Sequence, residues 1–384
     1  MTGSPISWDE RHGGFWSVTG YQECRAAAGA RDGLASAPHV HIPPSGLARR
    51  GLRIYALESD GAEHRQERAV LLDTLGPSAS ARFEEHIRAL ADRLLASLDW
   101  AAAPDLASGY AFRLPLEVIC DIVAVPGDLR PELRDLTNTL GFRAASEDQA
   151  AAAAQRVIEI AGATIAGRRA APPGDWLDTL IAASPDDGSL DAAPVRAVVA
   201  LITGGHHSTS RGIASLIARI LTDPALRALV AQDPGRLPAA AEEVLRLHTP
   251  LPSFSRRATE DRSIGDTAIG TGEQLLLDYA AANRDPAVYP EPERFELDRR
   301  PQHLAFGWGP HRCVGMHLAR AQMRIAAAGL LAFAPDIELA EPVRWRGPAE
   351  PERLLVRSAA AERAASDTAP GRCPAAPTQR RETC

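Results

Sequence analysis

Apolar residues recur at the three- and four-residue spacing of α-helices along most of the chain. This spacing predicts helices over residues 81–98, 115–123, 150–166, 195–221 and 237–247. The stretch 194–221 is almost entirely apolar, too long for a strand and polar only at its middle. We therefore expect a long central helix that is buried on most of its sides.

The pattern changes after residue 254. Short alternating segments with Gly265, Gly270 and Gly272 predict small β-hairpins up to residue 277. Residues 283–302 are rich in Pro, Arg and acids without periodicity, which predicts a long ordered coil, and a helix is expected again over 314–331. A last β segment is predicted over 343–356.

The end of the chain, from residue 358, is rich in Ala, Pro and charge and has no core-forming pattern. No linker or repeat divides the chain before it. The prediction is a mostly α fold with small β-sheets, forming one domain over residues 1–357, followed by a disordered tail over 358–384.

Composition and charge exclude several classes of protein. A net charge of −7 argues against non-specific nucleic-acid binding, which needs a dense basic surface. No apolar run approaches the roughly 20 residues of a membrane span, and residues 1–16 carry no signal peptide. The five cysteines are scattered without CxxC spacing, so we expect no disulfide framework or zinc site, and a cytoplasmic protein.

One cysteine stands in an unusual context, the segment Phe306-Gly-Trp-Gly-Pro-His-Arg-Cys-Val-Gly315. A lone cysteine is usually an inert buried thiol. Here, Gly307 and Gly309 permit a tight loop, and Cys313 falls just before a predicted helix. Free N–H groups at that helix start favour an anion and lower a thiol pKa, as a thiolate ligand to iron requires.

Two weaker motifs precede that loop. Glu243 and Arg246 lie three residues apart on one helical face, where they can pair, and residues 281–286 read Ala-Ala-Asn-Arg-Asp-Pro. Each is uninformative by itself. Together, in this order and spacing, the three motifs resemble those of the cytochrome P450 family, over roughly residues 16–356. The organisation is similar to the soluble bacterial branch of that family.

The resemblance implies a long helix over a haem b whose iron is held by the Cys313 thiolate, with Phe306 packed close to the sulfur. Cationic or hydrogen-bonding side chains would hold the two haem propionates, since buried carboxylates need such partners. Glu243 and Arg246 would be structural, with Arg294 or Arg299 completing their network. The residues assigned to haem binding are His64, Arg68, Arg256, Phe306, Gly307, His311, Cys313 and Gly315.

The central helix departs from the family pattern of a small residue, Gly, any residue, an acid and Thr. The run here is Gly204-Gly205-His206-His207-Ser208-Thr209, with His207 at the acid's position and Ser208 at the alcohol's. The candidate catalytic residues are Gly205, His207, Ser208 and Thr209. Two adjacent glycines cost roughly 1 kcal/mol each in a helix, which favours a local bulge at the haem.

Three alternatives stay open for the altered pair. His207 with Ser208 or Thr209 could replace the proton relay, because an unperturbed histidine titrates near neutrality. The substrate could supply an acidic or hydrogen-bonding group instead. Alternatively, His207 points away and only satisfies a core hydrogen bond. A weakened relay would suit oxidative decarboxylation, ring coupling or desaturation better than plain hydroxylation.

The resemblance implies oxidative tailoring of a small-molecule or peptide natural-product intermediate by a monomer. It would use O2 and electrons from a separate ferredoxin and its reductase, docked near Arg312, Arg320 and Arg324. A non-catalytic partner of another enzyme and a haem-based sensor or electron carrier are the alternatives. Substrate contacts are expected from residues 37–58, 201–209, 251–254 and 348–354. In the first segment, Arg49, Arg50 and Arg53 indicate either an anionic substrate group or a solvated basic loop.

Overall fold

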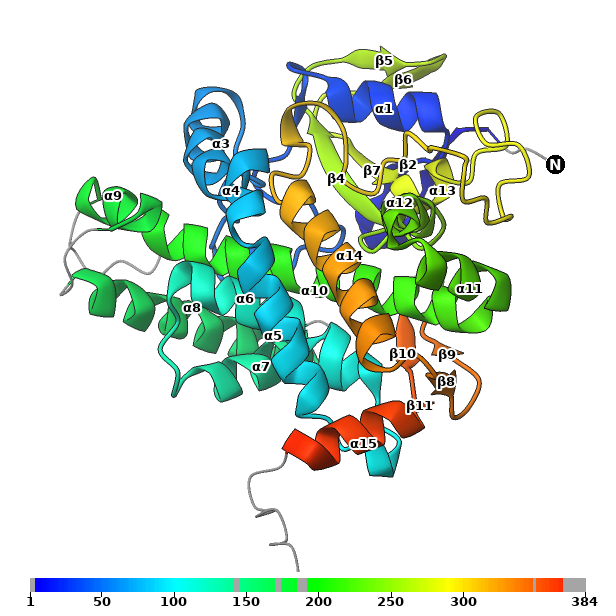
Figure 1. Ribbon diagram of the computed structural model, residues 1–384. Coiled ribbons are helices and arrows are strands. Elements are labelled where there is room, and N and C mark those ends of the chain that lie inside the picture. Colours follow the sequence, from blue (N-terminus) through cyan, green and yellow to red (C-terminus); the bar gives the residue numbers. More distant parts are fainter. Residues whose placement is uncertain (1–3, 141–145, 170–173, 185–191, 348–349, 369–384) are drawn as a thin grey trace, which may run out of the picture.

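The helix α10 (Ala193–Thr222) crosses the molecule, and several other helices pack on it (Figure 1). Pro194 lies in its first turn, where a missing N–H costs nothing, and Asp223 ends it. Asp223 also accepts a hydrogen bond from Leu226 N at 3.0 Å and so caps the next helix. The computed structural model describes residues 4–140, 146–169, 174–184, 192–347 and 350–368.

Helices form most of the described chain. They are α1 (Tyr21–Gly29), α2 (Gly46–Arg49), α3 (Gly61–Leu75), α4 (Pro77–Arg82), α5 (Glu84–Ala96), α6 (Arg113–Val123), α7 (Arg130–Asn138), α8 (Glu147–Arg169), α9 (Trp176–Ala182), α11 (Pro224–Gln232), α12 (Leu237–Leu247), α13 (Tyr279–Ala282), α14 (Met316–Phe333) and α15 (Ala359–Thr368). The larger hydrophobic core lies where α6, α8 and α14 meet α10, with α5 packed on α14 and α6.

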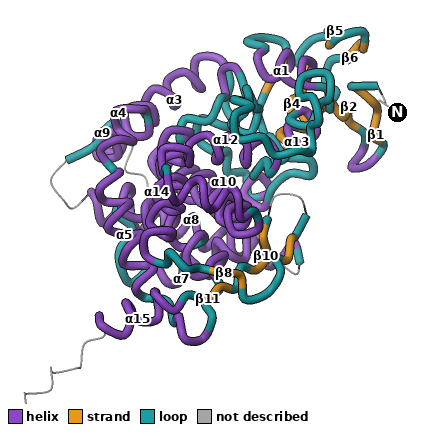
Figure 2. The backbone as a smooth tube through the Cα atoms, turned by 45° about the vertical axis from the view of Figure 1, so that its right-hand side comes forward, coloured by secondary structure: helices purple, strands orange, loops and turns teal. Residues whose placement is uncertain are grey.

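The strands are short and lie mainly at one side of the helices (Figure 2). They are β1 (Ile6–Asp9), β2 (Phe15–Val18), β3 (Leu34–Ala35), β4 (Ser253–Ala258), β5 (Arg262–Ile264), β6 (Thr267–Ile269), β7 (Gln274–Asp278), β8 (Glu338–Leu339), β9 (Arg344–Trp345), β10 (Pro351–Arg353) and β11 (Val356–Arg357). The largest sheet has the order β1-β2-β7-β4-β3, in which only the β2–β7 pair is parallel. A second, smaller core lies between this sheet and α1.

The mostly α fold class with small sheets is confirmed, and so is each predicted helix. The first, predicted over 81–98, is α5, which begins only at Glu84 because Phe83 separates it from the end of α4. The hairpins predicted over 254–277 are β4 to β7, and the coil over 283–302 is present. No described helix is long and apolar enough to cross a membrane.

The prediction of a tail disordered from residue 358 is wrong for its first part. Residues Ala359–Thr368 form α15, which packs on α5, and Ala361 is fully buried. Ser358 starts this helix, because its hydroxyl accepts from Ala361 N at 3.1 Å and donates to Asp336. Alanine-rich sequence has high helix propensity, and packing on α5 stabilises it. The rest of the predicted tail, 369–384, lies outside the described residues.

Two alanine-to-aspartate substitutions test whether α15 packs on the rest of the protein. Ala361→Asp places a charge in a fully buried position, and we expect a loss of about 3 kcal/mol or more, read as a lower thermal unfolding midpoint. Ala359→Asp is the control, since that residue is exposed in the first turn of the helix, where an acid is neutral or slightly stabilising. Equal midpoints for the two variants would show that α15 does not pack.

Candidate active site

A pocket brings the Cys313 loop and the central helix together. Its lining comes from the segment Ile54–Leu57, from α10, from the start of α14 and from the loop that contains Phe306, Gly307 and Cys313. The lining is mainly apolar, and no Asp or Glu of the described chain contributes to it. Residues more than 250 positions apart in the sequence therefore share one cavity.

The loop around Cys313 is tight, as its glycines predicted. Gly307 and Gly309 have φ of +66° and +69°, a region that other residues rarely adopt. A Cβ atom at Gly309 would lie 2.5 Å from the Ala28 carbonyl oxygen, so only glycine fits against α1. Cys313 N donates to Phe306 O at 2.8 Å, and this bond turns the thiol toward the start of α14.

The expectation that this loop by itself keeps Cys313 deprotonated is wrong. The Gly315 N–H and the guanidinium groups of Arg68, Arg320 and Arg312 favour the thiolate, but burial outweighs them and raises the thiol pKa. The accessible surface of Cys313 faces the pocket that it lines, so it is poorly solvated despite being exposed. A cation bound to the sulfur would be needed to hold the thiolate at neutral pH.

The described residues contain no cluster of three or more His, Cys, Asp or Glu side chains that could hold a metal ion. A metal at Cys313 would therefore need its remaining ligands from a cofactor. The pocket offers cations for such a group, since Arg68, Arg256 and His311 all line it.

Two histidines near these arginines, His64 and His311, could bind the acidic groups of a cofactor. The His64 and His311 rings lie against each other at a tilt of 37°, with centroids 4.0 Å apart. His64 Nε2 and His311 Nδ1 are buried, and neither has a hydrogen-bond partner within the described chain. Buried polar atoms normally form hydrogen bonds, so these two nitrogens are free to bind a ligand in the pocket. The pocket thus fits a haem held by Cys313, with its propionates near these four side chains.

Asp60 is a site residue that the sequence analysis missed. Its carboxylate faces His311 Nε2 at 3.4 Å and accepts from the backbone N–H groups of Ser36 and Ala37 at 2.9 to 3.0 Å. Desolvation raises the pKa of Asp60, but the hydrogen bonds from His311, Ala37 and Ser36 lower it by more, so that the pKa falls to about 2. The available signal was its position before α3, four residues ahead of His64, where an acid is a common helix N-cap.

The central helix presents a narrow polar strip to the pocket. Gly204, Gly205, Ser208 and Thr209 line it, as residues on one helical face should. The Ser208 hydroxyl donates to Gly204 O at 3.0 Å, which leaves its oxygen able to accept. The expected bulge is absent, because α10 is continuous, and Gly205 instead makes room for Ile119 of α6, which a Cβ would approach to 2.9 Å.

His207 does not belong to this strip, which corrects its assignment as a catalytic residue. Its Nε2 donates to Thr137 O of α7 at 2.7 Å, and it is not among the residues lining the pocket. Each helical residue is rotated by about 100° from the last, so position 207 lies roughly 130° from the centre of the face that 204, 205, 208 and 209 turn to the cavity. The placement favours the third alternative, a core hydrogen bond. His206 likewise contacts Phe112 O at 3.0 Å.

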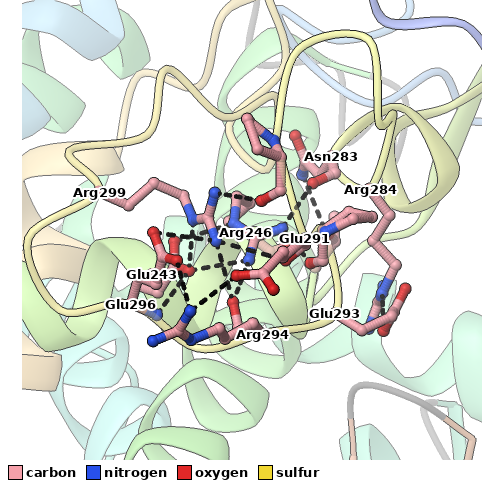
Figure 3. A network of polar contacts seen from close by, with 12 residues as sticks. Glu243, Arg246, Asn283, Arg284, Glu291, Glu293, Arg294, Glu296 and Arg299 are labelled. Atoms are coloured by element: carbon pink, nitrogen blue, oxygen red, sulfur yellow. Dashed lines mark hydrogen bonds and ion pairs between the residues drawn. The ribbon is translucent and has the colours of Figure 1, made fainter.

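The Glu243–Arg246 pair is fully buried and extensively bonded (Figure 3). All five N–H donors of Arg246 are used: two on Glu243 and three on the carbonyls of Asn283, Pro292 and Arg294. Arg299, not the side chain of Arg294, completes the network, since its Nε donates to Glu243 Oε1 at 3.0 Å. The Arg294 side chain is 65% exposed and pairs with Glu291 and Glu296.

The four segments expected to contact the substrate line the pocket only in part. Ile54–Leu57, Leu201, Leu251 and Phe254 line the pocket, whereas Pro252 does not. Residues 348–349 lie outside the described chain, and Glu350, Pro351 and Glu352 line a second, arginine-rich cavity. Arg49 pairs with Glu147, Arg50 with the Ala151 carbonyl and Arg53 with Glu63, which favours the basic-loop interpretation over an anionic substrate group.

The network around Glu243 and Arg246 predicts that Arg299 and Arg294 differ in their contribution to stability. Arg299→Ala leaves Glu243 short of a buried partner, and we expect a loss of about 3–5 kcal/mol and poor recovery of folded protein. Arg294→Ala removes an exposed ion pair worth less than about 1 kcal/mol. Thermal midpoints of the two variants provide the measurement. A midpoint for Arg299→Ala as high as that for Arg294→Ala would contradict the assignment.

Burial lowers the pKa of His207 from 6.5 to about 4. Its neutral form therefore contributes its full stability to the fold above pH 6.5, and this stability is lost progressively as the pH falls from 6.5 to about 4. We expect His207→Gln, which keeps a donor for Thr137 O, to reduce the loss between pH 7 and pH 4.5 by about 2–3 kcal/mol.

Thermal midpoints at the two pH values measure this difference. The control is His12→Asn, which changes an exposed histidine and should leave the pH dependence as it is. If His207→Gln and the unchanged chain lost stability equally, His207 would not be a neutral core residue.

Comparison with known proteins supports the identification. A family model described as Cytochrome P450 matches residues 236–333. The nocardicin C N-oxygenase of Nocardia uniformis subsp. tsuyamanensis is 32% identical over 341 residues, covering 86% of this chain and 85% of that protein. The mycinamicin IV hydroxylase/epoxidase of Micromonospora griseorubida is 30% identical over 355 residues, covering 87% and 88%.

Solved structures agree with these relatives. The tirandamycin C-bound P450 monooxygenase TamI superposes with a TM-score of 0.78 at 30% identity, covering 90% of each chain. The P450BioI structure with an acyl carrier protein gives 0.81 at 26% identity, covering 92% of this chain and 95% of that one. These relatives are named as oxygenases and hydroxylases, which confirms the expectation of an enzyme. From its motifs, its fold and its relatives, the chain belongs to the cytochrome P450 family and is an oxidoreductase.

Proposed function

We propose that the chain is a monooxygenase or oxidase that binds haem b, with the Cys313 thiolate as the axial ligand. The observation that carries this proposal is a pocket lined by a tightly held cysteine together with Arg68, Arg256 and His311, with the His64 ring against His311 and a buried, partnerless nitrogen on each of the two imidazoles. Arg68, Arg256, His64 and His311 would hold the propionates, Phe306 would pack beside the sulfur, and Gly307 and Gly315 would leave room for it.

The bound haem would supply oxygen activation with electrons delivered from outside. The chain's own contribution on the other side is limited to hydroxyl groups, because Ser208 and Thr209 are the polar side chains that α10 presents to the pocket. Ser208 is oriented by its bond to Gly204 O and can accept a hydrogen bond from water or substrate. With His207 turned away and no carboxylate in the described lining, proton supply depends on these hydroxyls, on water or on the substrate itself.

This weak relay favours a substrate that brings its own acidic or hydrogen-bonding group. It also favours outcomes that need only hydrogen-atom or electron abstraction, such as decarboxylation, coupling or desaturation. The mainly apolar lining, with Ile54, Leu201 and Phe254, suits a hydrophobic molecule. The names of relatives acting on nocardicin C and mycinamicin IV support a natural-product intermediate of small-molecule or peptide type.

Electrons would come from a separate ferredoxin and its reductase to a monomeric cytoplasmic enzyme. Two of the three arginines expected at the docking face already pair within the chain, Arg320 with Glu242 and Arg324 with Glu84. Arg312 forms no ion pair with another described residue and would be the main steering charge of the three.

The carbon-monoxide difference spectrum of the reduced protein tests the axial ligand. We expect a Soret band near 450 nm, which thiolate ligation produces, and we expect Cys313→Ala to lose it. Cys120→Ala is the matched control, since that thiol is buried in the core away from the pocket and the band should persist. Haem binding without the 450 nm band in the unchanged protein would refute the proposed ligation.

A further inference from the structure

One wall of the pocket is a short segment held by buried charges. Ile54, Tyr55, Ala56 and Leu57 line the cavity from the connection between α2 and α3. Ala56 has a φ of +57°, which is costly for a residue with a side chain. Something must therefore hold this turn in place.

Glu67 of α3 holds the turn. Its Oε2 accepts from Ala56 N and from Ser59 Oγ, both at 2.7 Å. Its Oε1 faces the Arg196 guanidinium of α10, with Nη2 at 3.0 Å, and both side chains are 8% exposed. A carboxylate so deeply placed is retained only when its oxygens are satisfied, as they are here.

Glu58 and Arg196 fix the start of the same turn. Glu58 is fully buried and accepts from Ile54 N at 2.8 Å and Val40 N at 3.2 Å. Arg196 Nε donates to Arg53 O at 2.9 Å. The backbone at the start of the pocket-lining segment and at Ala56 within it is thus bonded to charged side chains from inside the protein.

We propose that Glu67 is a positioning residue for substrate selection. Together with Glu58 and Arg196, it keeps the Ile54–Leu57 wall rigid and so limits the size of the apolar ligand that fits beside the haem. This inference rests on the proposed function, because it takes the pocket to be the substrate site. A connection bonded at several points cannot yield to a larger ligand without breaking charge-assisted bonds.

The experiment uses the haem-loaded full chain and compares Glu67→Gln with Glu63→Gln. Glutamine keeps the size but puts a donor where Glu67 has an acceptor. Glu63 lies one turn away on α3, is 44% exposed and pairs with Arg53 at the surface. The control therefore removes a carboxylate from the same helix, with its Arg53 pair and a long contact of 3.9 Å to Arg196 Nη1, while the bonds of Glu67 to Ala56 N and Ser59 Oγ stay in place.

Azole ligands of increasing size serve as probes, titrated by the shift of the Soret band. For Glu67→Gln we expect imidazole to bind within twofold of the unchanged protein. The affinity ratio of clotrimazole to 4-phenylimidazole should rise at least tenfold. Amide hydrogen exchange in peptides covering residues 52–59 should quicken at least tenfold. Glu63→Gln should stay within twofold in all three measurements.

A role in folding alone would lower the thermal midpoint of Glu67→Gln and leave the affinity ratio and the exchange rates unchanged. That result would overturn the proposal. Loss of haem with an unchanged ratio would also overturn it, because the effect would then act through Arg68 or His64. If Glu67→Gln does not fold, Arg196→Gln takes its place under the same criteria. Absence of the 450 nm band in the unchanged protein would refute the proposed function separately, while hydrogen exchange would still test the wall.

Discussion

The buried ion pair of Glu243 and Arg246 is the constraint on which the cofactor side of the molecule depends. Desolvating two charges costs several kcal/mol per ion, and only a complete set of partners offsets it. Those partners come from Asn283, Pro292, Arg294, Glu296 and Arg299, all in a coil without regular structure. The pair therefore dictates the path of a segment that has no hydrogen-bonded ladder of its own.

That coil leads directly to the Cys313 loop. Asn283 bonds to Arg246 through its carbonyl oxygen and receives Leu304 N on Oδ1 at 2.6 Å, and Gly307 N then donates to Leu304 O. A short chain of hydrogen bonds thus runs from a helix interior to the residue next to Phe306. The thiol is placed by this chain and not by α14 alone, since burial raises the pKa of the Cys313 thiol despite the N–H group of Gly315 at the start of that helix.

The sequence was most informative where local pattern and local chemistry agree. Helical periodicity predicted α6, α8, α10, α12 and α14, and the glycines predicted the loop at Cys313. It failed where the outcome depends on direction or on distant partners. Whether His207 or Ser208 faces the pocket depends on helix rotation, and the choice of Arg299 over Arg294 depends on how a coil folds back. The helix α15 was missed because its stability comes from packing on α5.

The two sides of the pocket differ in how they restrict chemistry. On the Cys313 side, buried charges and orphaned imidazole nitrogens define what must bind. On the wall formed by Ile54–Leu57, Glu67 and Glu58 lie behind the lining residues, so their charges hold the backbone without entering the cavity. The cavity therefore has a rigid wall but no carboxylate among its described lining residues, and an enzyme built in this way selects by shape while leaving proton supply to hydroxyls, water and substrate.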